Sequence, residues 1–147
     1  MLNELFRLDV EVGMPQTVGQ AAAGERRCIP ITGGRLYGRL NGKVLAGGAD
    51  WQVLRPDGIA DLDARYMLET DDGAHVEVHS RGLRVSAPEV MARMAAGERV
   101  DPSAYYMRTA MRFETAASGL QWLVGRLAVG FGERLPDLVR LTVCEVG

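Results

Sequence analysis

The sequence predicts an all-β protein, either a barrel or a sandwich, built as one domain. Hydrophobic and polar residues alternate along most of the chain, and this two-residue period is typical of half-buried strands. Gly, Asn, Asp and Pro cluster between these segments at short, regular intervals, as they do between hairpin-connected strands. Strands and long helices do not alternate, which argues against a Rossmann-type sheet. The length of 147 residues suits a single domain, residues 1–147.

The N-terminal part of the chain reads as strands joined by turns. Segment 4–12 alternates strictly, and one of its faces carries Phe6, Leu8, Val10 and Val12. Segment 19–27 is rich in small residues and predicts a loop. Asn41 and Gly42 lie between two short strand-like runs and predict a hairpin turn in which both residues take positive φ.

Segment 59–70 predicts a long strand with two contrasting faces. One face carries Ala60, Leu62, Ala64, Tyr66 and Leu68, and the other carries Asp61, Asp63, Arg65 and Glu69. A shift of one residue reverses every side chain of a strand, so the pattern leaves open which face points inward. That choice decides whether Arg65 belongs to a site or to the surface.

One short helix is expected over segment 86–97. Ser86 and Glu89 have the spacing of a capping box, and Pro88 stands in the first turn, where a missing N–H costs little. Gly97 can end the helix in the left-handed conformation. The rest of the chain, 105–146, resumes the strand pattern, so we expect eight to ten strands in all.

Composition excludes several classes of partner. The net charge of −2 gives no basic face for nucleic acid. No apolar run reaches 18 residues, so no membrane span is expected, and the first residues lack the apolar run of a secretory signal. Cys28 and Cys144 lie far apart and suit two reduced thiols. These features predict a cytoplasmic protein.

The sequence contains no complete motif for a cofactor site, a metal site or a common class of hydrolase. The stretch "GRLNGK" has three residues between its glycines where a phosphate loop needs four. His75 and His79 in "HVEVH" would lie about 13 Å apart on a straight strand, too far to share a metal ion. No GxSxG elbow is present. We therefore expect neither a cofactor nor a metal site.

Asp50 is the most informative carboxylate. It follows Gly47 and Gly48 and precedes Trp51 at the start of a strand. One interpretation is a turn cap for the glycine loop. The other is a carboxylate at a barrel mouth beside an aromatic wall, which would raise its pKa and suit acid/base work.

Other candidates depend on which strand faces point inward. Segment 105–115 carries a polar stripe that is either a solvated face or the lining of a lumen: Tyr106, Arg108, Arg112 and Glu114. In a polar lumen, Arg65 would meet Glu114 or an anionic ligand. Trp122 packs in the core or, with Trp51, forms the wall of a pocket.

A resemblance to a known family rests on five segments that follow one another in this order: "LAGGADWQVLRPDG", "DARYMLETDDGAHVEV", "SRGLR", "YYMRTAMRFETA" and "QWLVGRLAVGFGER". They resemble the bacterial and fungal family catalogued as domain of unknown function 3237. The resemblance covers about residues 28–146 and implies a single-domain antiparallel β-barrel shaped like the small ligand-binding barrels of lipocalin or calycin type. For fungal relatives it also implies cofactor-free cyclisation of small phenolic molecules. The matching positions are Gly47, Gly48, Asp50, Trp51, Arg65, Tyr66, Thr70, Asp72, Gly73, Gly82, Arg108, Phe113 and Glu114.

Two functions stay open. The first is a barrel that binds a small phenolic or acidic metabolite and acts on it by acid/base chemistry, as a cyclase or isomerase. Its expected catalytic residues are Asp50, Arg65 and Glu114, and its expected ligand-binding residues are Trp51, Tyr66, Arg108 and Trp122. The second is a non-catalytic ligand-binding or assembly module that forms a homo-oligomer through exposed strand edges.

Overall fold

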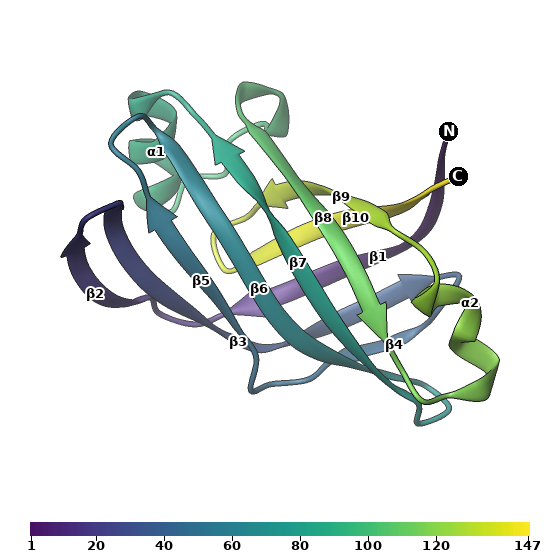
Figure 1. Ribbon diagram of the computed structural model, residues 1–147. Helices are drawn as coiled ribbons and strands as arrows, with labels where there is room; N and C mark the ends of the chain where they lie inside the picture. Colours follow the sequence, from purple (N-terminus) through teal and green to yellow (C-terminus); the bar gives the residue numbers. More distant parts are fainter.

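The computed structural model describes residues 1–147 and is built almost entirely of strands (Figure 1). Two α-helices and two single 3₁₀ turns, Pro102–Ala104 and Ser118–Leu120, interrupt them. No helix is long and apolar enough to cross a membrane. The elements are β1 (Leu2–Val12), β2 (Gln16–Ala21), β3 (Gly24–Gly38), β4 (Gly42–Val44), β5 (Ala49–Leu54), β6 (Ile59–Thr70), β7 (His75–Val85), α1 (Pro88–Ala95), β8 (Tyr106–Glu114), α2 (Gln121–Val124), β9 (Ala128–Arg134) and β10 (Leu138–Val146).

The strands form one antiparallel sheet that closes on itself. From β1 the sheet runs through β10, β9, β8, β7 and β6 to β4, β3 and β2, and β1 also pairs with β3. β4 and β5 both lie between β3 and β6, so together they fill one position in a ring of eight. β2 pairs only with β3 and lies outside the ring. The expected antiparallel β-barrel is confirmed.

The two-residue period places the hydrophobic face of each strand inside the barrel. On β1 the inward side chains Phe6, Leu8 and Val10 are buried, as predicted. Leu5 is buried as well, because the register shifts between Glu4 and Phe6. On β6 the apolar face is the inner one and carries Ala60, Leu62, Tyr66 and Leu68. The charged face of β6 lies outside.

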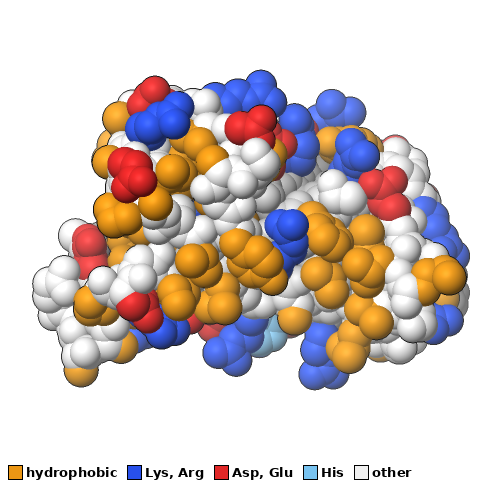
Figure 2. All heavy atoms as spheres, turned by 90° about the horizontal axis from the view of Figure 1, so that it is seen from above, with side chains coloured by type: hydrophobic (Ala, Val, Ile, Leu, Met, Phe, Trp, Pro, Cys, Tyr) orange, Lys and Arg blue, Asp and Glu red, His pale blue; other side chains and the backbone are white.

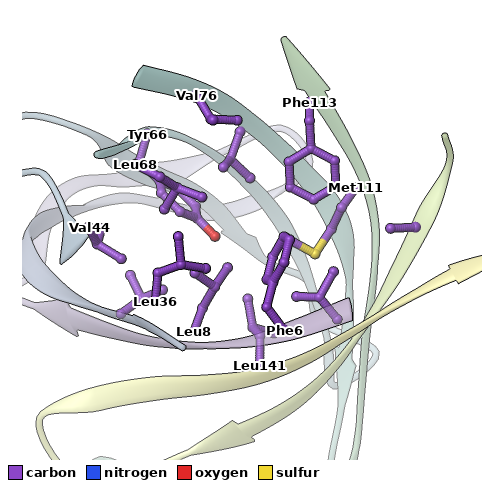
Figure 3. Close-up of a cluster of buried hydrophobic side chains, with 14 of the residues drawn as sticks. Phe6, Leu8, Leu36, Val44, Tyr66, Leu68, Val76, Met111, Phe113 and Leu141 are labelled. Carbon is purple, nitrogen blue, oxygen red and sulfur yellow. The ribbon is translucent and has the colours of Figure 1, made fainter. Parts of the chain in front are cut away.

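One end of the barrel is filled by a solid hydrophobic core (Figure 3). The rings of Phe6 and Phe113 meet edge to face with centroids 5.7 Å apart, a geometry that aromatic pairs favour. Leu123 of α2 is fully buried in the same cluster. This end therefore has no room for a ligand.

The other half of the interior is lined differently. A smaller cluster joins α1 and the segment after it to the wall, and its members are Ala60, Leu62, Met94, Val100, Tyr105 and Met107. The turns from β1 to β2 and from β9 to β10 lie at this end of the barrel (Figure 1). The space between the two clusters is the cavity described below.

Several local expectations need correction. Segment 19–27 is not a loop, because β2 and β3 form a hairpin through it. The turn at Asn41 and Gly42 exists, but neither residue has positive φ. Gly38 takes that conformation instead, with φ of 126°, and the amide side chain of Asn41 bonds to both backbone groups of Gly38.

The helix prediction is right in position and wrong in its cap. Helix α1 ends at Ala95, and Gly97 follows its C-cap in the left-handed conformation with φ of 84°, as expected. Its N-terminus has no side-chain cap, and the hydroxyl of Ser86 is buried without a partner. A second short helix, α2, occupies residues where the sequence pattern predicted a strand.

Candidate functional site

The open half of the barrel holds a cavity of about 150 Å³. Eleven of its twenty lining residues are hydrophobic, among them Val10, Leu62 and Leu141. The turn residues Pro15 and Pro136 also line it, so its mouth lies at the end of the barrel where those turns are found. A cavity of this size accommodates a molecule of about one aromatic ring. Its polar lining comprises Asp50, Gln52, Tyr66, Ser80, Arg84, Thr109 and Arg134.

Asp50 is fixed in the cavity wall by two hydrogen bonds. The amide Nε2 of Gln52 donates to its Oδ2 at 2.7 Å, and the backbone N–H of Asp63 donates to its Oδ1 at 3.0 Å. Burial raises the pKa of the Asp50 carboxyl above its ordinary value, while the two hydrogen bonds and the positive charge of Arg84 oppose the shift. The carboxyl group is thus held in one orientation with an increased affinity for a proton.

Arg84 is a buried guanidinium on the inner face of β7. Only 2% of the residue is exposed, and its Nε has no hydrogen-bond partner. Burial, together with repulsion from Arg134 and Arg27, lowers the pKa of Arg84 to about 10. A buried cation without a bonded partner is costly, because the protein does not replace the water that it has lost.

Two hydroxyl groups in the wall also lack partners. Tyr66 Oη and Thr109 Oγ1 are both buried and unbonded, and the Tyr66 hydroxyl points into the barrel interior (Figure 3). Burial and the nearby charge of Asp50 raise the pKa of Tyr66, so it remains a neutral donor. Buried polar groups are normally paired, so these two hydroxyl groups are free to form hydrogen bonds with a polar group that enters the cavity.

Arg27 and Arg134 extend the positive charge around Arg84. Arg27 lies on the inner face of β3 and donates from Nε to Gln52 Oε1 at 3.0 Å. Gln52 in turn donates to Asp50, so a continuous chain of hydrogen bonds links Arg27 to the carboxyl group. Arg134 lines the cavity from β9, and burial and the charge of Arg27 lower its pKa.

The structure brings two of the seven predicted site residues to the cavity, Asp50 and Tyr66. Trp51 follows Asp50 on the strand and therefore points outward, with 56% of its surface exposed. Arg65 lies outside for the same reason, 3.8 Å from a Glu77 carboxylate oxygen. Glu114 is also on the outer face, beside Arg65 in a shallow surface depression. Arg65 and Glu114 thus lie together as expected, but the barrel wall separates them from the lumen.

Arg108 and Trp122 lie in two further places. Arg108 rests on the outer surface with its guanidinium carbon 5.1 Å from the Tyr106 ring centroid and 4.6 Å from that of Phe131. Trp122 lies on α2, under the guanidinium of Arg39 at 4.0 Å. The aromatic wall expected from Trp51 and Trp122 is therefore absent, because neither residue lines the cavity.

Sequence reasoning missed Arg84, Gln52 and Thr109. The signal was present on β7, where the inner face starts with Val76 and Val78 and the same two-residue period reaches Arg84. Thr109 likewise shares a face with the buried Met107 and Met111. Polar residues that continue an apolar strand face were the observation that could have found the site.

No group of three or more His, Cys, Asp or Glu side chains lies together in a way that could hold a metal ion. The polar groups of the cavity are instead guanidinium, amide, hydroxyl and one carboxyl group. This donor set suits hydrogen bonding and proton transfer better than metal ligation.

Fold and cavity together define a small closed antiparallel β-barrel with a partly polar cavity in its lumen. The chain belongs to the family described as protein of unknown function DUF3237, whose model matches residues 1–146. A UPF0311 protein of Rhodopseudomonas palustris is 41% identical over 143 residues, which are 97% of this chain and 94% of the relative.

Solved structures agree with this assignment. A conserved protein of unknown function from Rhodopseudomonas palustris superposes with a TM-score of 0.94 at 39% identity, covering 100% of this chain and 97% of the other. A protein described as beta-barrel like, from Acinetobacter baumannii, gives 0.87 at 38% identity, with 100% and 96% covered. A protein described as an enzyme from Penicillium herquei gives 0.72 at 22% identity, with 97% and 93% covered, and shares the fold.

Proposed function

We propose that the barrel lumen binds a small, partly apolar molecule and that Asp50 transfers a proton to or from it without a cofactor. The observation that carries this proposal is the fixed carboxyl group of raised pKa inside a cavity of one-ring size. General acids and bases work best when their pKa lies near the operating pH, and burial moves Asp50 in that direction. Isomerisation and ring closure are reactions that proton transfer by such a group can catalyse without a cofactor.

Arg84 and Tyr66 complete the proposed chemistry. When a base removes a proton next to a carbonyl or phenol, negative charge develops on oxygen. The unpaired Nε–H of Arg84 and the Tyr66 hydroxyl are donors that can stabilise that charge. The apolar part of the wall excludes water, which strengthens both interactions. The free thiols of Cys28 and Cys144 support a reducing, cytoplasmic location for this activity.

The test follows proton transfer directly. Phenylacetone and phenylpyruvate, each with one ring and an acidic C–H beside a carbonyl, are incubated with the protein in D₂O. NMR then measures the rate at which that hydrogen exchanges for deuterium. We expect the protein to accelerate the exchange of at least one compound. Asp50→Asn is expected to reduce the acceleration by about 100-fold or more, the usual contribution of a general base.

Matched controls separate catalysis from folding. Asp61→Asn makes the same chemical change on the outer face of β6, where the side chain is 48% exposed, and should leave the exchange rate unchanged. Binding of each compound is measured in parallel by ligand-observed NMR. If the compounds bind the wild type with no acceleration, or if Asp50→Asn exchanges as fast as wild type, the catalytic proposal is wrong.

A second candidate is a non-catalytic binding or assembly module. Leu83, Val85 and Tyr106 are exposed large hydrophobic residues on the outer faces of β7 and β8, and Val85 pairs across the strands with Tyr106. Hydrophobic side chains also gather on the face shown in Figure 2, with Lys and Arg side chains among them. Such surfaces favour a homo-oligomer. Binding without accelerated exchange would support this candidate.

A further inference from the structure

We propose that the ligand of the lumen carries a carboxylate, and that Arg84 and Arg134 bind this group while its ring fills the apolar part of the cavity. This inference rests on the proposed function, because it names the class of molecule that the same lumen takes. It commits to an acidic ligand rather than a neutral phenol or ketone.

The charges of the lumen are unequal. Arg27, Arg84 and Arg134 act on one another through repulsion at the open end of the barrel. Two carboxylates act on this group: Asp50 within the cavity and Glu25 beside Arg27. Three guanidinium groups against two carboxylates leave one positive charge in excess, and protonation of Asp50 would leave two. A negatively charged ligand group balances this excess.

None of the three arginines is neutralised by direct contact. All ion pairs within 4.0 Å involve other residues. Arg84 gives the strongest support for an anionic ligand, because it is buried, it lines the cavity, and its Nε has no hydrogen-bond partner. A carboxylate accepts two parallel N–H bonds from a guanidinium, so this group matches the unused donors in both charge and geometry.

The hydrogen bonds and positions of the three arginines indicate which of them can bind the ligand. Arg27 donates a hydrogen bond to Gln52, and Gln52 donates one to Asp50. These bonds hold the Arg27 side chain away from the centre of the cavity. Arg134 has no side-chain hydrogen-bond partner and lies beside the mouth residues Leu135 and Pro136. A carboxylate that enters through the mouth meets Arg134 first and reaches Arg84 deeper inside. The ring then contacts apolar wall residues such as Ile31, Leu62 and Leu141.

The experiment compares two probes that differ only in the group proposed to meet the arginines. Isothermal titration calorimetry measures the binding of 4-hydroxybenzoate and of 4-hydroxybenzamide to the wild-type protein and to variants. The amide has the same ring, the same hydroxyl group and nearly the same shape. We expect wild type to bind the carboxylate about 10-fold more tightly or better, since hydrogen bonds to charged groups are the stronger ones.

Variants assign the preference to its residues. Arg84→Gln should abolish the difference between the two probes, and Arg134→Gln should reduce it. Arg81→Gln is the matched control, because Arg81 lies on the same strand with its side chain outside and 70% exposed. It should keep the full preference. The comparison on wild type needs no mutation, so the proposal can be tested even if Arg84→Gln does not fold.

The outcomes separate this proposal from the one on which it rests. Equal or tighter binding of the amide overturns the carboxylate site and leaves a ligand-binding lumen intact. A preference for the carboxylate that survives in folded Arg84→Gln and Arg134→Gln also overturns it, since the charge would be recognised elsewhere. If neither probe binds at about 10 mM, both the carboxylate site and the ligand-binding lumen are contradicted at this ligand size.

Discussion

The carboxyl group of Asp50 experiences two opposing influences. Burial favours its protonated form, whereas hydrogen bonds from Gln52 and from the backbone of Asp63 favour the carboxylate. Burial outweighs the hydrogen bonds, so the folded protein binds this proton more tightly than the unfolded chain does. A group of this kind destabilises the fold when it is ionised and ceases to do so when it is protonated.

This balance predicts a pH-dependent difference in stability between wild type and Asp50→Asn. The pKa of Asp50 is higher in the folded protein than in the unfolded chain. As the pH falls through the folded-state pKa toward the unfolded-state pKa, the folded protein takes up the proton first, and this uptake stabilises the fold. Wild type should therefore gain stability relative to the variant as the pH falls toward about 4, the ordinary pKa of an aspartate in an unfolded chain. Urea denaturation at several pH values measures the difference. A wild type that loses stability relative to the variant on acidification would show that the hydrogen bonds outweigh burial.

At the level of single residues, the sequence predicted part of the site. Asp50 stood out because it follows two glycines at a strand start, and Tyr66 belonged to the apolar face of its strand. Arg65, Trp51 and Glu114 have the chemistry of a site, but the sequence pattern does not reveal which strand face points inward. Each points outward because neighbouring side chains on a strand alternate. Arg84 was missed because a charged residue on an apolar face reads as an irregularity in the pattern.

Among the elements, β7 shows how a glycine adjusts the barrel wall. Gly82 lies between Leu62 of β6 and Thr109 of β8. A Cβ atom built there would overlap the backbone carbonyl oxygen of Arg108. The neighbouring strand is held by hydrogen bonds and cannot yield as a flexible side chain would. The absence of a side chain at this position therefore lets β7 and β8 approach each other beside the cavity.

Gly82→Ala is accordingly expected to destabilise the protein by about 2 kcal/mol, the usual cost of forcing an extra methyl group into a packed structure. Gly119→Ala serves as the control, since a Cβ at Gly119 meets no atom within 4 Å. That change should shift stability by less than about 0.5 kcal/mol. Thermal unfolding followed by circular dichroism compares the two. Similar melting temperatures for Gly82→Ala and wild type would mean that β8 shifts without cost.

Strand periodicity predicted most elements, and the exceptions have physical causes. β2 was missed because its residues are mostly exposed on both faces, so the sequence shows no alternation there. α2 was missed because it has only four residues, too few to show a helical period. The capping box at Ser86 failed because the N-cap position falls one residue later, at Ala87, and the buried Ser86 hydroxyl has no hydrogen-bond partner.

For the molecule as a whole, closure depends on the pairing of β1 with β3, which the sequence pattern alone did not reveal. The alternation of hydrophobic and polar residues shows which side chains face inward, but it does not show which strands pair. A sandwich and a barrel therefore give the same sequence pattern. The distribution of the core was equally hidden. Large side chains such as Phe6 and Phe113 fill one end, whereas at the other end the side chains of Thr109 and Met107 lie directly against Gly130 and Gly132 of β9.

The ring also predicts where the molecule opens most easily. β2 lies outside the barrel, pairs on one side only and is largely exposed, whereas β7 pairs on both sides. Backbone amides of Gln16–Ala21 should exchange with deuterium about 100-fold faster or more than those in the middle of β7, because less structure must open to expose them. Hydrogen exchange read by mass spectrometry measures both. Equal protection would indicate that a second chain covers the edge of β2.

The positions of the two tryptophans determine what fluorescence can reveal about this protein. Trp51 is exposed on the outer wall, and Trp122 lies beneath Arg39 on α2, beside the filled end of the barrel. Neither indole touches the lumen, so tryptophan emission reports unfolding and surface events. The ligand proposed for the lumen would contact the phenol of Tyr66 instead. The occupied state is therefore optically silent at tryptophan wavelengths, and a flat emission titration is compatible with a full lumen.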